Sequence, residues 1–172
     1  AAHNRGAPDS ACVGKEIVRR CWHGQFLPAV FHHNHVDVWI CGTATLIIKD
    51  GKPHLRIFLN QEEKDLLAGH DFVAPQFIVT PGVSKFRQFE WPQKSSFHYG
   101  VASTNLDIDA TGQVVHSSAA YEYPAGMGFG AEVAGRIREG RFIPGFRDGK
   151  VEPCHFTWSL VFNNYLPQLK TG

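Results

Sequence analysis

Alternation of apolar and polar residues constrains the fold of this chain more than any other feature. In residues 154–162 every even position is apolar, from Cys154 to Phe162, while His155, Thr157 and Ser159 stand between them. Successive side chains of a strand point to opposite faces, so this segment predicts a strand with one buried face. Similar strand-like segments occupy residues 36–48, 53–59, 72–80, 84–91, 97–108 and 113–123. The chain is therefore predicted to be rich in β-structure.

Turn residues between these segments indicate short antiparallel connections. Asp50-Gly51 separates the first two segments and is a strong hairpin signal. Asn60 resembles a helix cap and Gly69 a helix stop, which predicts one short helix ending near Leu67. Seven glycines interrupt residues 125–150, where we expect a long loop or flap around a possible short helix with Val133 and Ile137.

Seven or eight strands joined by short turns predict an all-β domain. We favour a closed antiparallel barrel of the lipocalin or calycin type, because closure removes unpaired edges. This assignment is based on architecture, since the Gly-x-Trp opening of lipocalins is missing. The alternative is a two-sheet sandwich, such as the jelly roll of cupins. Residues 1–11 are predicted to be a flexible N-terminus and residues 12–172 a single domain.

Charge and hydropathy exclude several classes of partner. The net charge is +1, and no run of basic residues exceeds Arg19-Arg20, so nucleic acid is not an expected partner. No apolar run approaches the roughly 20 residues that a membrane-spanning helix needs, so no membrane span is expected.

The cysteines predict an oxidising compartment. Cys12, Cys21, Cys41 and Cys154 form an even set without a C-x-x-C pair, which favours two disulfides over a zinc or thioredoxin motif. Three connectivities are open, and we favour Cys12–Cys21, closing a short N-terminal loop, with Cys41–Cys154. The alternative is that Cys41 and Cys154 are buried thiols. The chain begins Ala-Ala-His-Asn, as a mature protein does after removal of a signal peptide, so we expect secretion.

One short motif suggests a metal site. His33 and His35 have the spacing that places both imidazoles on one face of a strand. Residues 33–51 resemble the first metal-binding motif of the cupins, in which His-x-His is followed by Glu and later by Gly. The Glu position, near residues 38–40, holds no carboxylate here, and the second motif would place Lys85, a poor ligand, where a His is needed. We therefore favour no metal and expect no cofactor, with His33 and His35 as weak candidate ligands or as an acid or base in a pocket.

Aromatic and basic residues on the predicted strands suggest a ligand pocket instead. Such pockets have apolar walls and a few polar groups that fix orientation. A plain packed core is the alternative use of these aromatics. The candidate ligand-binding residues are Trp39, Arg56, Arg87, Tyr99, Tyr121 and Trp158.

These observations leave three classes of function open. The first is a secreted pocket protein for a small, partly apolar or aromatic molecule, which acts as a carrier or as a cofactor-independent isomerase or cyclase. The second is a metal-dependent, cupin-like enzyme that uses His33 and His35. The third is a secreted interaction or effector protein without a cavity, which acts through an exposed patch that includes Trp22, Trp91 or Phe129.

Overall fold

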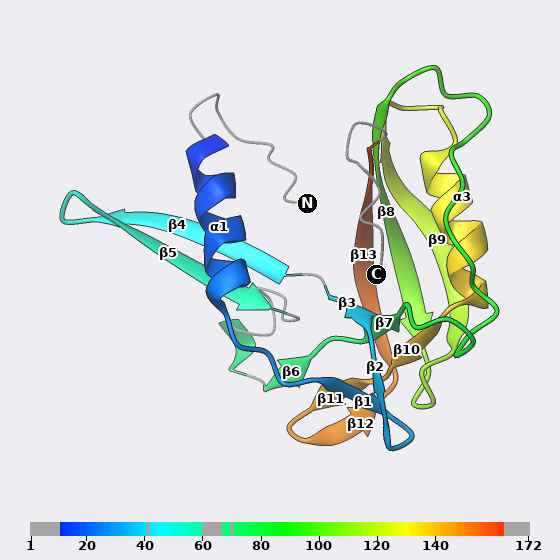
Figure 1. The fold of residues 1–172 in the computed structure, drawn as a ribbon, viewed down its shortest axis with the longest axis horizontal. Helices are drawn as coiled ribbons and strands as arrows, with labels where there is room; N and C mark the ends of the chain where they lie inside the picture. Colours follow the sequence, from blue (N-terminus) through cyan, green and yellow to red (C-terminus); the bar gives the residue numbers. More distant parts are fainter. Residues whose placement is uncertain (1–10, 41, 60–66, 70, 164–172) are drawn as a thin grey trace.

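The structure is a computed structural model that describes residues 11–40, 42–59, 67–69 and 71–163. Its described part consists mostly of β-strands (Figure 1). The helices are α1 (Ala11–His23), α3 (Phe129–Arg136) and the 3₁₀ helix η2 (Ile137–Glu139). The strands are β1 (Ala29–Phe31), β2 (Asn34–Val36), β3 (Val38–Trp39), β4 (Gly42–Lys49), β5 (Lys52–Leu59), β6 (Phe72–Val73), β7 (Gln76–Ile78), β8 (Tyr99–Ile108), β9 (Val114–Tyr123), β10 (Arg141–Ile143), β11 (Gly145–Arg147), β12 (Lys150–Glu152) and β13 (Cys154–Asn163).

The largest sheet has the order β13-β8-β9. Strands β13 and β8 pair antiparallel without interruption, and β8 pairs with β9 with register shifts after Ser103 and Asp107. The turn between β8 and β9 is closed by Asp109, whose Oδ1 accepts hydrogen bonds from the N–H groups of Thr111 and Gln113 at 2.8 and 3.0 Å. These bonds lower the pKa of Asp109. The strands predicted at residues 97–108, 113–123 and 154–162 are confirmed as β8, β9 and β13.

Helix α3 covers one face of this sheet (Figure 1). Phe129, Val133 and Ile137 lie four residues apart, so they fall on one side of the helical segment, and all three are fully buried. The ring of Phe129 lies directly over Gly100 of β8, where a Cβ would come within 2.4 Å of it. The short helix predicted around Val133 is confirmed as α3, and Ile137 begins η2 directly after it. The long loop or flap predicted for the rest of residues 125–150 is wrong, because the segment also forms β10 and β11.

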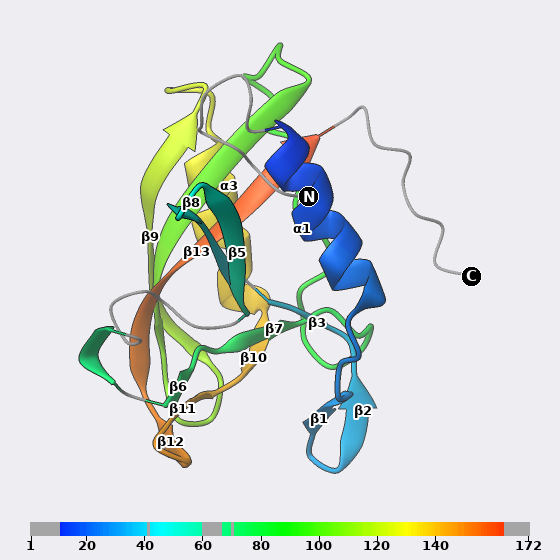
Figure 2. The same cartoon turned by 90° about the vertical axis from the view of Figure 1, so that its left-hand side faces the viewer.

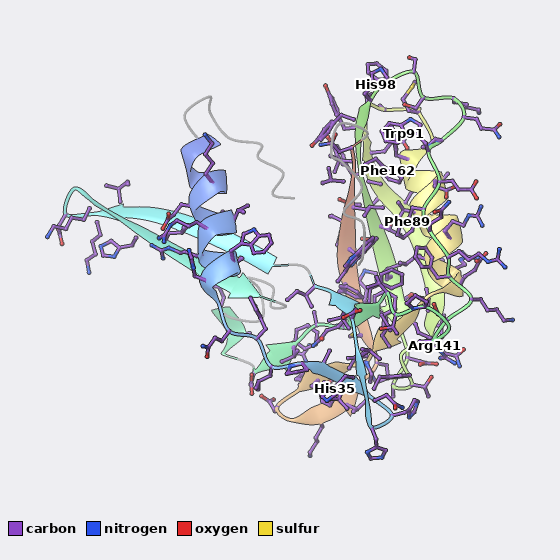
Figure 3. All side chains as sticks on the ribbon, viewed as in Figure 1. His35, Phe89, Trp91, His98, Arg141 and Phe162 are labelled. Carbon is purple, nitrogen blue, oxygen red and sulfur yellow. The ribbon has the colours of Figure 1, made fainter. Side chains whose placement is uncertain are left out.

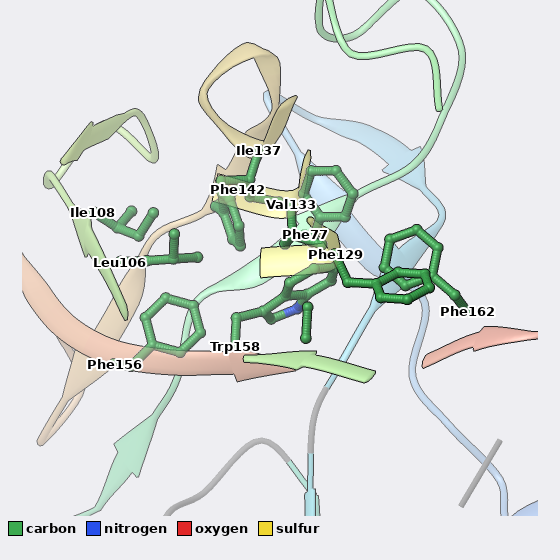
Figure 4. Close-up of a cluster of buried hydrophobic side chains, with 11 residues drawn as sticks. Phe77, Leu106, Ile108, Phe129, Val133, Ile137, Phe142, Phe156, Trp158 and Phe162 are labelled. Atoms are coloured by element: carbon green, nitrogen blue, oxygen red, sulfur yellow. The ribbon is translucent and has the colours of Figure 1, made fainter. Parts of the chain in front are cut away.

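An aromatic core joins α3 and the main sheet to the small sheet β10-β7-β3 (Figure 4). Phe77 of β7 and Trp158 of β13 meet with ring centroids 5.6 Å apart. The predicted strand at residues 84–91 is wrong: Phe86 N–H donates to the Glu139 carbonyl and Glu90 N–H to the Glu132 carboxylate. The backbone of residues 84–91 thus donates hydrogen bonds to α3 and η2 instead of to a neighbouring strand. The aromatic side chains of this segment pack against the core.

The strand predicted over residues 36–48 is divided among β2, β3 and β4. The Asp37 N–H donates to the Thr80 hydroxyl at 2.7 Å instead of continuing a ladder, and β3 pairs with β7. The segment at 72–80 is likewise split into β6 and β7 by Ala74-Pro75, where proline has no N–H to donate. Strand β6 pairs with β11 in the sheet β12-β11-β6, and β1 pairs with β2.

Helix α1 and the hairpin β4-β5 lie beside each other, apart from the main sheet (Figures 1 and 2). The predicted hairpin at Asp50-Gly51 is confirmed, with positive φ at both residues. Arg20 of α1 donates from Nη1 to the Leu55 carbonyl of β5 at 3.3 Å. The N-terminal loop expected between Cys12 and Cys21 is instead this helix. Most of the helix predicted to end near Leu67, and residues 1–10, fall outside the described residues.

The sheets of the described residues do not close into a barrel. They form separate two- and three-stranded units, so closure, which was the basis for the lipocalin-like assignment, is not seen in residues 11–40, 42–59 and 71–163. The predicted predominance of β-strands is confirmed, with helices α1 and α3 beside them. Among the described helices, none combines the length and apolarity that crossing a bilayer requires.

Candidate functional site

The predicted ligand-binding tryptophans belong to the aromatic core. Trp158 is 2% exposed and lies on the face of the sheet that α3 covers. Trp39 of β3 stacks on it, with ring centroids 6.3 Å apart and planes 10° from parallel, and is 45% exposed. This pair therefore closes one side of the core.

The other predicted ligand-binding residues lie elsewhere. Tyr99 of β8 and Tyr121 of β9 project from the face of the main sheet opposite to Trp158. Arg87 is exposed in the segment between β7 and β8. Arg56 lies on β5, and its side chain is outside the described part of the structure. The structure thus distributes these residues over both sheet faces and a separate hairpin.

The structure shows a different concave site, which we call the lower groove. It has a volume of about 760 Å³ and lies between the β1-β2 hairpin, the segment that precedes it, and strands β6, β7 and β11. Val36 and Ile143 of its wall form a small second core together with Ile78. The groove is lined by Phe26, Leu27, Pro28, Ala29, Val30, His35, Val36, Asp37, Val38, Ile40, Val73, Gln76, Thr80, Ile143 and Phe146.

Apolar side chains dominate the wall of the lower groove. Leu27 is 95% exposed, Phe26 57% and Val30 50%, so the wall presents large apolar groups to solvent. No sequence signal marked Phe26 and Leu27, because they lie outside any helix or strand and show no periodicity. Their position in the groove wall follows only from the fold, which places the segment after α1 beside β2 and β7.

Four polar residues line the same groove. His35 is on β2, Asp37 follows it, Gln76 begins β7 and Thr80 follows β7. Asp37 is held from both sides, since its N–H donates to Thr80 Oγ1 at 2.7 Å and its carbonyl accepts from Val79 N–H at 2.9 Å. Figure 3 shows His35 at the end of the molecule that carries β1 and β2, far from Trp91 and Phe162. His35 is thus the sequence candidate that the structure places in a concave site.

The expected pairing of His33 and His35 on one strand face is wrong. His33 has φ 65° and His32 φ 47°, so both lie in the turn of the β1-β2 hairpin, and only His35 is on the strand. Asn34 Nδ2 donates to the His32 carbonyl at 3.0 Å and helps to close this turn. No group of three His, Cys, Asp or Glu side chains with metal-binding geometry occurs in the part of the chain that is described.

The proposed interaction patch is also corrected. Phe129 is fully buried and Trp91 is half-buried against Phe129 and Phe162, so neither is available at the surface as a patch requires. Trp22 is 80% exposed on α1. Other exposed apolar residues occur both in the lower groove, at Phe26, Leu27 and Val30, and on β9, at Val115.

A carboxylate occupies the glycine-rich run 126–130, which belongs to the segment predicted to be a flap. Glu122 of β9 accepts from Gly130 N–H at 2.7 Å and from Gly128 N–H at 3.3 Å. Burial of this carboxylate opposes its ionisation, but backbone N–H donors from residues 126–130 outweigh burial and lower the pKa of Glu122. The run is a backbone anion site filled by the protein's own side chain.

The favoured Cys12–Cys21 disulfide conflicts with α1. The two positions are nine residues apart in one continuous helix, which separates them by about 13 Å along the axis, beyond the reach of a disulfide. Cys21 has no disulfide partner in the described residues, and Cys41 lies outside them. The presence of disulfides through other pairings stays a prediction.

Comparisons with known proteins give no match: no protein family, no curated protein and no solved structure shows significant similarity to this chain.

Proposed function

We propose that this protein binds a small, partly apolar molecule in the lower groove. The observation that carries this proposal is the groove itself, a concavity of about 760 Å³ with apolar walls and four polar groups. Ligand sites for small molecules fall in the range of about 300–1,000 Å³ and share this composition. The ligand site therefore differs from the barrel interior for which the aromatic candidates were selected.

The exposed side chains supply the driving force for binding. The side chains of Phe26, Leu27 and Val30 are each exposed to solvent over at least half of their surface. Covering such apolar surface is favourable by about 25 cal/mol per Å² before the cost of association. An aliphatic or aromatic group of the ligand is expected to lie against these three residues.

The polar residues orient the other end of the ligand. His35 donates or accepts through its ring nitrogens, Asp37 accepts, and Gln76 does both. A ligand with one or two hydroxyl or carbonyl groups matches this set. A carrier and a cofactor-independent isomerase or cyclase share these requirements, and in the enzyme His35 is the residue placed to move a proton.

Titration with the apolar fluorophore 8-anilinonaphthalene-1-sulfonate tests this function. Val30→Asp places a charge on the apolar wall at an exposed position, and we expect it to weaken binding of the dye about tenfold or more. Val115→Asp is the matched control, because Val115 is 66% exposed on β9 and lies outside the groove. Equal weakening in both variants, or in neither, contradicts the proposal.

Native mass spectrometry of the protein as isolated addresses the ligand directly. A bound organic mass that is absent from Val30→Asp supports the groove and begins to identify the molecule. For the enzymatic alternative, His35→Gln is expected to retain binding of that molecule while abolishing its conversion.

A further inference from the structure

The main sheet has one buried face and one face with a very different composition. On β8 the residues that point toward α3 include Leu106 and Ala102, which are fully buried. Ser103 and Asn105 alternate with these positions and point the other way, and they pair with Ser159 and Thr157 on β13. We call this outer surface the polar sheet face and define it by Ser103, Asn105, Tyr121, Tyr123, Thr157 and Ser159.

Direct hydrogen bonds arrange the small residues of the polar sheet face. The hydroxyls of Ser103 and Ser159 are 2.8 Å apart, and Thr157 Oγ1 donates to Asn105 Oδ1 at 3.0 Å. Each bond fixes the orientation of a side chain but leaves groups that can still form hydrogen bonds to a ligand. The Asn105 amide has two N–H donors, and each hydroxyl has a further lone pair. Thr157 and Ser159 are exposed. The rows thus present ordered donors and acceptors on an uninterrupted stretch of two paired strands.

Tyrosines occupy the next positions on the same face. Tyr121 pairs with Ser103, and Tyr123 with Val101, so both rings project on the outer side of β9. Tyr121 is 41% exposed and Tyr123 55%. Burial, and secondarily the neighbouring Tyr121 and Tyr123, raises the pKa of Tyr99 on the same face. One end of the face therefore offers aromatic rings beside the polar rows.

The polar sheet face carries little charge. Its acidic neighbour Asp107 lies 2.6 Å from His155 Nδ1, with His116 opposite it on β9. Glu122 projects to the other side, toward Gly130. Among the described residues, the two rows that contain Ser103 and Asn105 hold no charged side chain that could pair with a charged ligand. The surface thus matches a ligand that is neutral, rich in hydroxyl groups and partly apolar.

We propose that the polar sheet face binds a neutral oligosaccharide. Sugar rings have apolar C–H surfaces that lie against aromatic rings, and hydroxyls around the rim that exchange hydrogen bonds with serine, threonine and asparagine side chains. Tyr121 and Tyr123 form the stacking platform, and the Asn105 and Ser159 rows read the hydroxyls. This site is separate from the lower groove and does not depend on the function proposed for it.

Isothermal titration with cellohexaose, laminarihexaose, maltohexaose and xylohexaose tests the proposal on the whole chain. We expect at least one hexasaccharide to bind, and Tyr121→Ala and Tyr123→Ala each to weaken that binding about fivefold. Tyr121→Phe retains the ring and is expected to lose less than Tyr121→Ala. Val115→Ala, on the same strand, is the matched control and is expected to change affinity less than about twofold.

Two results would overturn this site. One is dissociation constants above about 10 mM for all four hexasaccharides. The other is binding that both tyrosine-to-alanine variants retain in full while their unfolding midpoints match that of the unaltered chain. Val30→Asp serves as a separating variant, because it impairs the lower groove and is expected to leave the sugar titration unchanged.

Discussion

At the scale of single residues, Glu122 explains why a run with three glycines holds one conformation. Its carboxylate accepts backbone N–H groups at the start of α3, where orphan donors and the helix dipole favour negative charge. Gly126 and Gly128 have φ of 76° and 90°, which other residues rarely adopt. The glycines therefore permit the loop, and Glu122 holds it.

We predict that Glu122→Gln lowers stability at neutral pH and removes a pH dependence. The folded pKa of Glu122 is below its ordinary value, so its stabilisation is present above the ordinary pKa and is lost as pH falls through the folded pKa. Loss of hydrogen bonds to a charged acceptor corresponds to about 1–3 kcal/mol at pH 7. Urea unfolding at pH 7 and at pH 3 measures both effects.

The control for this prediction is Glu139→Gln, at an exposed position after α3. We expect it to change unfolding by less than about 0.5 kcal/mol at either pH. If Glu122→Gln matches this control at pH 7, the carboxylate does not hold the glycine-rich run.

At the scale of elements, the contact between α3 and β8 requires a glycine at position 100 but not at position 135 of the helix. A Cβ at Gly100 would meet the Phe129 ring at 2.4 Å, whereas a Cβ at Gly135 would meet nothing within 4 Å. Gly100→Ala is therefore expected to destabilise by about 1–3 kcal/mol through overpacking. Gly135→Ala is expected to stabilise by about 0.5–1 kcal/mol, since glycine weakens a helix. Thermal unfolding measures the change in stability of each variant. A change of the same sign in both variants would contradict this packing.

The sequence predicted strands better than helices, for a physical reason. Strands β8, β9 and β13 have one buried and one polar face, so period-two alternation marks them. Helix α3 carries glycines that have low helix propensity, and its burial of Phe129 and Val133 outweighs that propensity. The sequence signal for this helix is the four-residue spacing of Phe129, Val133 and Ile137. Helix α1 was not predicted, because the two cysteines of residues 12–21 were interpreted as the ends of a disulfide-closed loop.

At the scale of the whole molecule, the candidate site could not be predicted because its parts come from distant segments. Leu27, His35, Gln76 and Phe146 meet only after β2, β7 and β11 are placed. The aromatic candidates were chosen for a barrel interior, and the described sheets form no closed barrel. His35 was identified through a spacing argument whose partner, His33, lies in a turn. The residue types in the sequence predicted that a pocket exists. The position of that pocket could be found only from the folded structure.

The disulfide arrangement is the whole-molecule prediction that follows from α1. We propose, as the sequence suggests, that the protein is secreted and has two disulfides, so its unreduced mass is lower than the reduced mass by four hydrogens. Because Cys12 and Cys21 lie nine residues apart on one helix, each is expected to pair with Cys41 or Cys154 instead. Trypsin cleaves after Lys15, Arg19 and Arg20 and separates the two helix cysteines, so mapping of unreduced peptides identifies the pairs. A Cys12–Cys21 link would show that α1 is interrupted in the oxidised protein. An unshifted mass would instead remove the main argument for secretion and leave four thiols, of which Cys21 is half-buried on α1.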